Sequence, residues 1–178
     1  MRIQSGGHTN NEAIVDTEGR LSVFSVSEEE DKHVNKHRGK VWSCPFTVTP
    51  TGAGDYFFYL KNTGTEDYFI TDVRIDAASA EVIGVHVVTG TASAGTTITP
   101  VNRNLGTTVS PDATIEYSVD TTGLTDAGEV FFLTCEANKL SHLRTTSNII
   151  ITPGSSIALK ATTGAVALKC MVSLVGGD

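Results

Sequence analysis

Cysteine, aromatic side chains and long apolar runs are all scarce in this chain of 178 residues. The three cysteines, Cys44, Cys135 and Cys170, are odd in number and far apart in the sequence, which argues against a disulfide framework. Cys135 and Cys170 alternate with apolar neighbours, as residues on the inner face of a strand do. We therefore expect buried free thiols that act as small hydrophobic side chains.

The apolar runs are too short to cross a bilayer, and residues 1–20 contain no stretch of signal-peptide length. The formal net charge is -7 and the isoelectric point is near 5.1. The basic residues between Lys32 and Lys40 directly follow the acidic run at 28–31, so they do not form a basic patch. We expect a protein made in a cytoplasm, with neither a membrane nor a nucleic-acid partner.

Glycine and the small hydroxyl residues are abundant. The 17 glycines and many threonines and serines separate short runs of valine, isoleucine and phenylalanine, while hydrophobic residues make up 39% of the chain and the mean hydropathy is -0.01. A chain of this length removes about 70% of its unfolded surface from water. We predict an all-β fold: an antiparallel β-sandwich, jelly-roll-like, with an extended N-terminal arm.

The strongest strand signal lies in residues 54–76. Residues 56–60 are apolar or aromatic at every position, which indicates a strand that is covered on both faces. Residues 68–76 mostly alternate, so only one of their faces needs to be covered. Asn62 and Gly64 lie between the two runs and tolerate the backbone angles of a tight turn. We predict that the two runs pair as a hairpin.

Residues 41–49 form another predicted strand. Trp42, Cys44 and Phe46 alternate with more polar residues and would share one buried face, while Pro45 favours an edge position because it has no N–H to donate.

The remaining strands are predicted from shorter signals. Residues 81–89 indicate a strand with a bulge at Gly84, followed by a loop of small residues at 90–97. Residues 130–135 predict a strongly buried strand. Residues 148–175 predict a meander of three strands joined by two tight turns.

The N-terminal quarter of the chain differs from the rest. We divide the sequence into an N-terminal arm with a charged linker, residues 1–40, and a β-sandwich body, residues 41–178. The arm is polar overall but carries a few side chains too apolar to be left in water, so we expect them to contact a neighbouring subunit. The candidate contact residues are Ile14, Leu21, Val23 and Phe24.

The sequence carries little recognisable chemistry. His33 and His37 have the i, i+4 spacing of zinc ligands on a helix, but the accompanying glutamate is missing and a charged linker is the better interpretation. Residues 90–97 have the glycine spacing of a phosphate-binding loop, but Thr96 stands where that loop has its lysine, so we interpret them as a connection between strands. No Gly-x-Ser-x-Gly elbow is present. The sequence leaves open whether two carboxylates that are distant along the chain meet in the fold as the catalytic pair of a glycosidase. We expect no catalytic residue, no cofactor and no metal site.

Three stretches together carry a family resemblance. The chain resembles a family of small virion proteins of tailed bacteriophages, in the same order along nearly its whole length. The stretches are residues 11–24, Asn-Glu-Ala-Ile-Val-Asp-Thr-Glu-Gly-Arg-Leu-Ser-Val-Phe, residues 99–106, Thr-Pro-Val-Asn-Arg-Asn-Leu-Gly, and residues 147–154, Ser-Asn-Ile-Ile-Ile-Thr-Pro-Gly.

The resemblance implies a capsid decoration, or cement, protein. Such a protein is a non-enzymatic β-sandwich, often a trimer, that binds the major capsid protein on the outside of the head and braces neighbouring capsomers. It would be made in the host bacterial cytoplasm and reside on the capsid surface of the virion. For the trimer, we expect an apolar flank that includes Met171 and Trp42 to supply the threefold contact.

Two alternatives remain from the sequence. One is a tail or baseplate component, or a module that binds a receptor or glycan on the host surface, built on the same sandwich. The other is a small hydrolase, for which the sequence gives no positive sign. An exposed aromatic groove would favour the binding module, and fold alone decides none of this.

Overall fold

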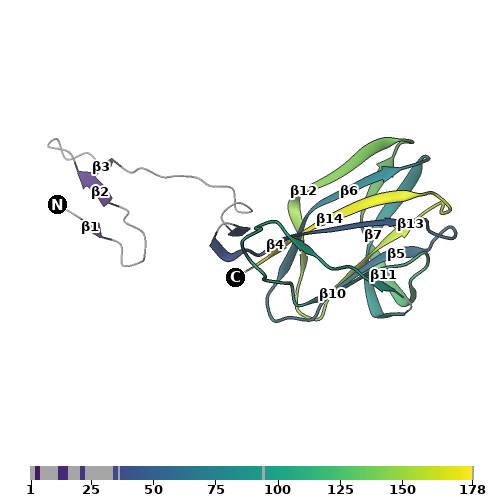
Figure 1. Ribbon diagram of the computed structural model, residues 1–178, viewed down its shortest axis with the longest axis horizontal. Helices are drawn as coiled ribbons and strands as arrows, with labels where there is room; N and C mark the ends of the chain where they lie inside the picture. Colours follow the sequence, from purple (N-terminus) through teal and green to yellow (C-terminus); the bar gives the residue numbers. More distant parts are fainter. Residues whose placement is uncertain are drawn as a thin grey trace. The chain divides into compact units, whose positions relative to one another are not determined.

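The computed structural model describes residues 3–4, 12–15, 21–22, 34–35, 37–93 and 95–177, and it places side chains from Val34 onward, except at 144–148 (Figure 1). Two compact units, Met1–Glu30 and Asp31–Asp178, divide the chain. In the described part of the first unit, three short strands pair antiparallel: β1 (Ile3–Gln4), β2 (Glu12–Val15) and β3 (Leu21–Ser22). The division into an arm at 1–40 and a body at 41–178 stays a prediction.

The described part of the second unit consists of two antiparallel sheets. One sheet has the order β11 (Thr122–Cys135), β7 (Glu81–Ser93), β13 (Ser156–Ala161), β5 (Tyr56–Asn62), β10 (Ala113–Tyr117) and β8 (Thr96–Thr97). The other has the order β12 (Lys139–Ile151), β6 (Tyr68–Ala77), β14 (Leu168–Gly176), β4 (Val41–Val48) and β9 (Val101–Asn102). The predicted all-β antiparallel sandwich is confirmed.

Eight of these strands pair in a nested fashion. The first strand of the body, β4, pairs with the last, β14, while β5 pairs with β13, β6 with β12, and β7 with β11. Successive nested pairs alternate between the two sheets, as though one long hairpin had been rolled up (Figure 1). This order of pairing is that of a jelly roll.

The predicted hairpin at residues 54–76 is wrong. Its two runs form β5 and β6, but these strands belong to opposite sheets and do not pair with each other. The buried side chain of Asn62 fixes the crossing: its amide donates to the carbonyl oxygens of Glu66 at 2.7 Å and Ile151 at 2.8 Å, and its oxygen accepts from the N–H of Gly64. The turn residues thus carry the chain across the end of the sandwich.

The core lies between the two sheets. The phenyl rings of Phe46 on β4 and Phe58 on β5 stack across the sandwich with centroids 5.3 Å apart. The predicted shared face of Trp42, Cys44 and Phe46 is confirmed, since all three belong to this core. Burying each large side chain of this kind contributes about 1.5–3 kcal/mol to folding. The largest fully buried side chains also include Phe57, Leu60, Ile70, Ile75, Ile83, Ile115, Ile151, Leu159 and Leu168.

Strand β5 is covered on its outer face as well, as predicted. A second apolar cluster, formed by Tyr59, Val88 and Ala158, lies outside the six-stranded sheet. The long pair of strands β7 and β11 reaches this face with its bent end, where Leu124 packs on the cluster. Gly90 permits the bend: its φ is +97°, and a Cβ there would lie 2.3 Å from the carbonyl oxygen of Gly123. The predicted loop at 90–97 is therefore wrong at its start, because β7 continues to Ser93.

Pro45 lies where β4 loses its outer neighbour. In the described residues, β9 pairs with β4 only at Trp42 and Ser43, so the position of Pro45 faces an open edge, as predicted. The predicted role of Trp42 in a contact between subunits is wrong. Its side chain is fully buried, and its indole N–H donates to the carbonyl oxygen of Val109 at 2.9 Å.

Candidate functional site

Strand β11 presents the largest run of exposed apolar side chains that the structure describes on one strand. Val130 is 47% exposed, Phe131 40% and Phe132 63%. The predicted burial of residues 130–135 is therefore wrong for its first half, while Cys135 is buried. The reason is position: β11 ends the six-stranded sheet, so β7 is its sole pairing partner among the described residues.

The ladder between β11 and β7 fixes where these side chains point. Phe131 lies opposite Val85, whose side chain is in the core, and Phe132 lies opposite Gly84. Since successive residues of a strand face opposite sides, Phe132 points outward and Phe131 points toward the rim of the core. Bulges interrupt the ladder between Asp126 and Gly128 and again between Glu129 and Phe131.

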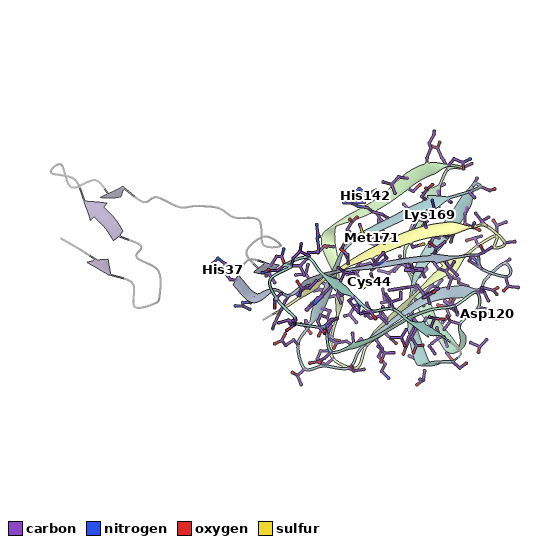
Figure 2. The ribbon with its side chains drawn as sticks, viewed as in Figure 1. His37, Cys44, Asp120, His142, Lys169 and Met171 are labelled. Carbon is purple, nitrogen blue, oxygen red and sulfur yellow. The ribbon has the colours of Figure 1, made fainter. Side chains whose placement is uncertain are left out.

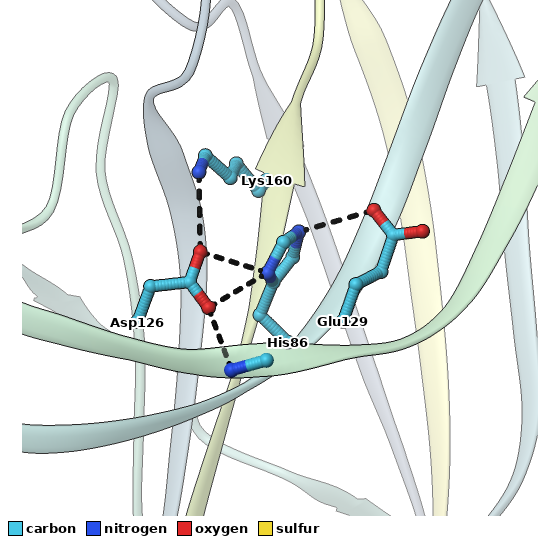
Figure 3. A network of polar contacts seen from close by, with 5 residues as sticks. His86, Asp126, Glu129 and Lys160 are labelled. Atoms are coloured by element: carbon cyan, nitrogen blue, oxygen red, sulfur yellow. Dashed lines mark hydrogen bonds and ion pairs between the residues drawn. The ribbon is translucent and has the colours of Figure 1, made fainter.

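A polar network fastens β11 to the sheet beside these bulges (Figure 3). The imidazole of His86 on β7 lies between two carboxylates of β11: its Nδ1 is 3.0 Å from Oδ2 of Asp126, and its Nε2 is 3.4 Å from Oε2 of Glu129. The ammonium group of Lys160 on β13 lies 3.3 Å from the same Asp126 oxygen. Charged groups of both signs therefore meet over three neighbouring strands.

Two further contacts complete the network. The backbone N–H of Gly128 donates to Oδ1 of Asp126 at 2.9 Å, which ties the carboxylate to its own bulge. The ring of Tyr56 lies edge-on to the His86 imidazole, with centroids 6.0 Å apart, and the ammonium of Lys160 lies 5.2 Å from the centroid of the Tyr56 ring. The aromatic ring thus shields one side of the charged cluster.

The surroundings shift the acidity of two of these groups. Desolvation acts to raise the pKa of Asp126, but the contacts with His86, the Gly128 N–H and the Lys160 ammonium outweigh it and hold that pKa well below its usual range. Burial, together with the neighbouring Asp126 carboxylate, raises the pKa of Tyr56 to about 12. The network therefore keeps Asp126 ionised and Tyr56 neutral.

Gly84 provides the space for this arrangement. A Cβ at that position would lie 2.5 Å from Nε2 of His86 and 2.9 Å from Oε2 of Glu129. The predicted bulge at Gly84 is wrong, because the ladders on both sides of β7 run without a shift through this residue. A pocket of about 250 Å³ opens next to it, lined by His86, Glu129, Lys160, Gly54, Ala161 and Thr162.

The network is better suited to holding strands than to chemistry. Each carboxylate of the network already has a nitrogen partner, and no alcohol or thiol nucleophile takes part in it. Within the described ranges, no group of three or more His, Cys, Asp and Glu side chains is arranged to hold a metal ion.

Another histidine–carboxylate pair lies on the outer face of the five-stranded sheet. Arg74 on β6 forms an ion pair with Asp72 at 2.7 Å, and Nε2 of His142 on β12 contacts the same carboxylate (Figure 2 labels His142). Ser173 lies directly opposite Asp72 in the ladder, but its hydroxyl is buried and makes no hydrogen bond. The three residue types of a hydrolytic triad are therefore close together without an accessible nucleophile.

The predicted contact residues of the N-terminal unit are partly described. Ile14 lies in β2 and pairs with Ser22, and Leu21 lies in β3 and pairs with Val15. Val23 and Phe24 lie outside the described residues. Nothing in the structure tests whether these four side chains contact another subunit, so the assignment stays a prediction.

The three cysteines are free and buried, as predicted. Burial raises the pKa of the Cys44 thiol to about 12, and it raises the pKa values of Cys135 and Cys170 as well. Among the described residues, no helix has the length and apolar character that crossing a membrane requires.

No protein-family model, no curated protein and no solved structure matches this chain. The site must therefore be interpreted from its own residues.

Proposed function

We propose that this chain is a non-enzymatic structural protein of a tailed-bacteriophage virion, a capsid decoration or cement protein that binds the outside of the head. The observation that carries the proposal is the resemblance of residues 11–24, 99–106 and 147–154 to that family. Its partner is the major capsid protein, and its role is to stabilise contacts between capsomers.

The body is consistent with such a role. It is a two-sheet sandwich with a large apolar core between the sheets, and Val130, Phe131 and Phe132 form an exposed apolar run on the edge strand β11. A decoration protein needs a rigid body and a broad contact surface, whereas an enzyme needs a concave site with convergent reactive groups. The net charge of -7 favours a protein partner over nucleic acid.

The N-terminal unit makes the contact with a neighbouring subunit. Its apolar residues Ile14, Leu21, Val23 and Phe24 lie across a neighbouring capsid or decoration subunit, and their burial offsets the entropy cost of ordering the segment. The division of the chain into two compact units, of which Met1–Glu30 is the first, supports this assignment.

The protein assembles as a closed homo-oligomer, a trimer in keeping with the family. Because Trp42 is buried, the threefold contact must use other residues of the body. Met171 on β14 is part-exposed on the outer face of the five-stranded sheet (Figure 2).

The deciding experiment is the copy number of this chain in purified virions, measured by quantitative mass spectrometry against the major capsid protein. Hundreds of copies in simple ratio to the capsid protein would support decoration. A few copies would move the protein to the tail or baseplate, and its absence from virions would refute a structural role.

A host-surface binding module is the second candidate, and one observation favours it. A hollow of about 430 Å³ is lined largely by hydroxyl groups and one aromatic ring, a combination suited to a sugar. Binding of the protein to host cells or to their isolated surface glycans, lost on replacing Tyr117 with alanine, would support this function over decoration. The lining residues are Thr47, Val48, Thr49, Thr96, Tyr117, Ser118 and Val119.

A further inference from the structure

The sheet edges in the described part of the body differ in how well they are protected. On one side of each sheet the edge is formed by a strand of only two residues, β8 in the six-stranded sheet and β9 in the five-stranded sheet. Beyond β9, the edge of β4 contains Pro45, which has no N–H to donate to an added strand. Very short strands and prolines are devices that block pairing with another chain.

The edge strand of the five-stranded sheet, β12, is also protected. Its ladder with β6 is interrupted between Arg144 and Ile149, and its sequence carries Lys139, His142 and Arg144. A broken register and basic residues both disfavour the addition of a further strand.

From Phe131 to Cys135, beyond its last bulge, β11 has none of these devices. Between Glu129 and Glu136 the sequence is Val-Phe-Phe-Leu-Thr-Cys, six residues without a charge, a proline or a glycine. The ladder with β7 is regular from Phe131 to Cys135, so the backbone groups on the open side are evenly presented. Exposed apolar and aromatic side chains line the same stretch. Such an edge is a template for strand addition.

We propose that β11 of one molecule pairs antiparallel with β11 of a second copy of this chain, joining their six-stranded sheets edge to edge. An uncharged strand with β-branched and aromatic residues is complementary to itself, and antiparallel pairing of identical strands is what a twofold axis requires. The net charge of -7 makes two copies repel each other over most of their surface, but residues 130–135 carry no charge, so this stretch is a place where two copies approach with little local repulsion.

The register follows from the faces of the regular stretch. With Phe132 opposite Phe132 of the second copy, the outward-facing rings meet, and Phe131 lies opposite Leu133 on the core side. A shift that placed Phe132 opposite Leu133 would pair an outward-facing side chain with one that faces the core, so one of the two sheets would have to be turned over. In the first register the two outward-facing phenyl rings lie side by side across the axis and shield each other from water.

This contact is independent of the proposed function, since it concerns copies of the chain and not the capsid. It is also distinct from the proposed trimer, because a threefold contact joins two different surfaces and a twofold contact joins a surface to itself. Breaking the β11 contact therefore halves the mass of the assembly, whether dimers become monomers or pairs of trimers become single trimers.

The test is the mass of the full-length chain by sedimentation equilibrium over a range of concentrations. The matched control for Phe132→Lys is Leu140→Lys on β12, since Phe132 is 63% exposed and Leu140 64%. We expect the wild-type protein and Leu140→Lys to share one mass and Phe132→Lys to have half of it. A wild-type mass that corresponds to a monomer or a single trimer at all concentrations would overturn the proposal, as would equal masses for both variants.

A second measurement tests the register on a folded protein. Phe132→Cys places two thiols opposite each other across the proposed axis, within reach of a disulfide. Under mild oxidation we expect this variant to form a covalent pair at least tenfold faster than Leu140→Cys. Equal rates would refute the pairing even if Phe132→Lys had lost its fold.

Discussion

The Nδ1 atom of His86 lies 3.0 Å from Oδ2 of Asp126, and this contact joins β7 to β11 beside a bulge, where the backbone ladder is interrupted. This side-chain contact holds the two strands together at a point where the regular backbone pairing is interrupted. Lys160 and Gly128 bind the same carboxylate. Asp126 is therefore the residue that fixes the course of the edge strand.

Asp126→Asn should destabilise the protein in a pH-dependent way. The pKa of Asp126 is lowered in the folded state, so its contribution is present above the unfolded pKa of about 3.9 and is lost as the pH falls through the lower folded value. We expect a loss of about 1 kcal/mol in the free energy of unfolding at pH 7, because the group is partly exposed and solvent weakens its ion pairs. Urea unfolding at several pH values measures it.

The control for that experiment is Asp120→Asn, since Asp120 is exposed at the surface. Its stability should follow the wild-type curve at every pH. A deficit of Asp126→Asn that stayed constant from pH 7 to below pH 3 would contradict the assigned role, because a protonated Asp126 should resemble asparagine.

Glu81 should be among the most sensitive carboxylates of the body. Its buried side chain accepts hydrogen bonds from the backbone N–H groups of Val82, Thr163 and Gly164 at 2.8–2.9 Å. A Glu81→Gln side chain keeps one acceptor oxygen and brings an amide that cannot accept. We expect a loss of about 2–3 kcal/mol in urea unfolding. The exposed Glu136 offers the comparison, and Glu136→Gln should change stability by less than about 0.5 kcal/mol.

The native protein should react slowly with thiol reagents. Burial raises the pKa of Cys44 to about 12 and raises those of Cys135 and Cys170, so almost no thiolate is present at pH 8. We expect a chromogenic disulfide reagent to label all three cysteines within minutes in denaturant and none on that timescale in the native state. Prompt labelling of one native cysteine would show that its region of the core opens readily.

The apolar residues of the N-terminal unit should govern capsid binding without affecting the body. Replacing Ile14, Leu21, Val23 and Phe24 together with serine in the full chain should weaken binding to undecorated capsids at least tenfold, because the buried apolar area is lost. The melting temperature should stay within about 2 °C of wild type. Leu105→Ser, which changes an exposed leucine of the body, is the control. Unchanged affinity of the fourfold variant would refute the arm hypothesis.

The sequence predicted what depends on local pattern. The apolar run at residues 56–60 correctly indicated a strand covered on both faces, and the alternation of Trp42, Cys44 and Phe46 correctly indicated their shared buried face. It did not predict which strands pair. Residues 54–76 have the pattern of a hairpin, but Asn62 directs the chain across the sandwich through bonds to Ile151, far away in sequence.

The polar network was missed for the same reason. His86 and Asp126 are 40 residues apart, and no local motif links them to Lys160. The exposure of Phe132 was missed because a run of apolar residues looks alike in a central strand and in an edge strand that binds another molecule. Only the position of β11 at the end of its sheet distinguishes the two.

The nested pairing of the strands has a consequence for how the protein folds. The strand that begins the body, β4, hydrogen-bonds with β14, which is also the partner of β6. During synthesis β14 follows both of these strands, so the five-stranded sheet has a gap at its centre until β14 has emerged from the ribosome. Because the central pairings join segments far apart in the sequence, this sheet should form late and slowly in folding.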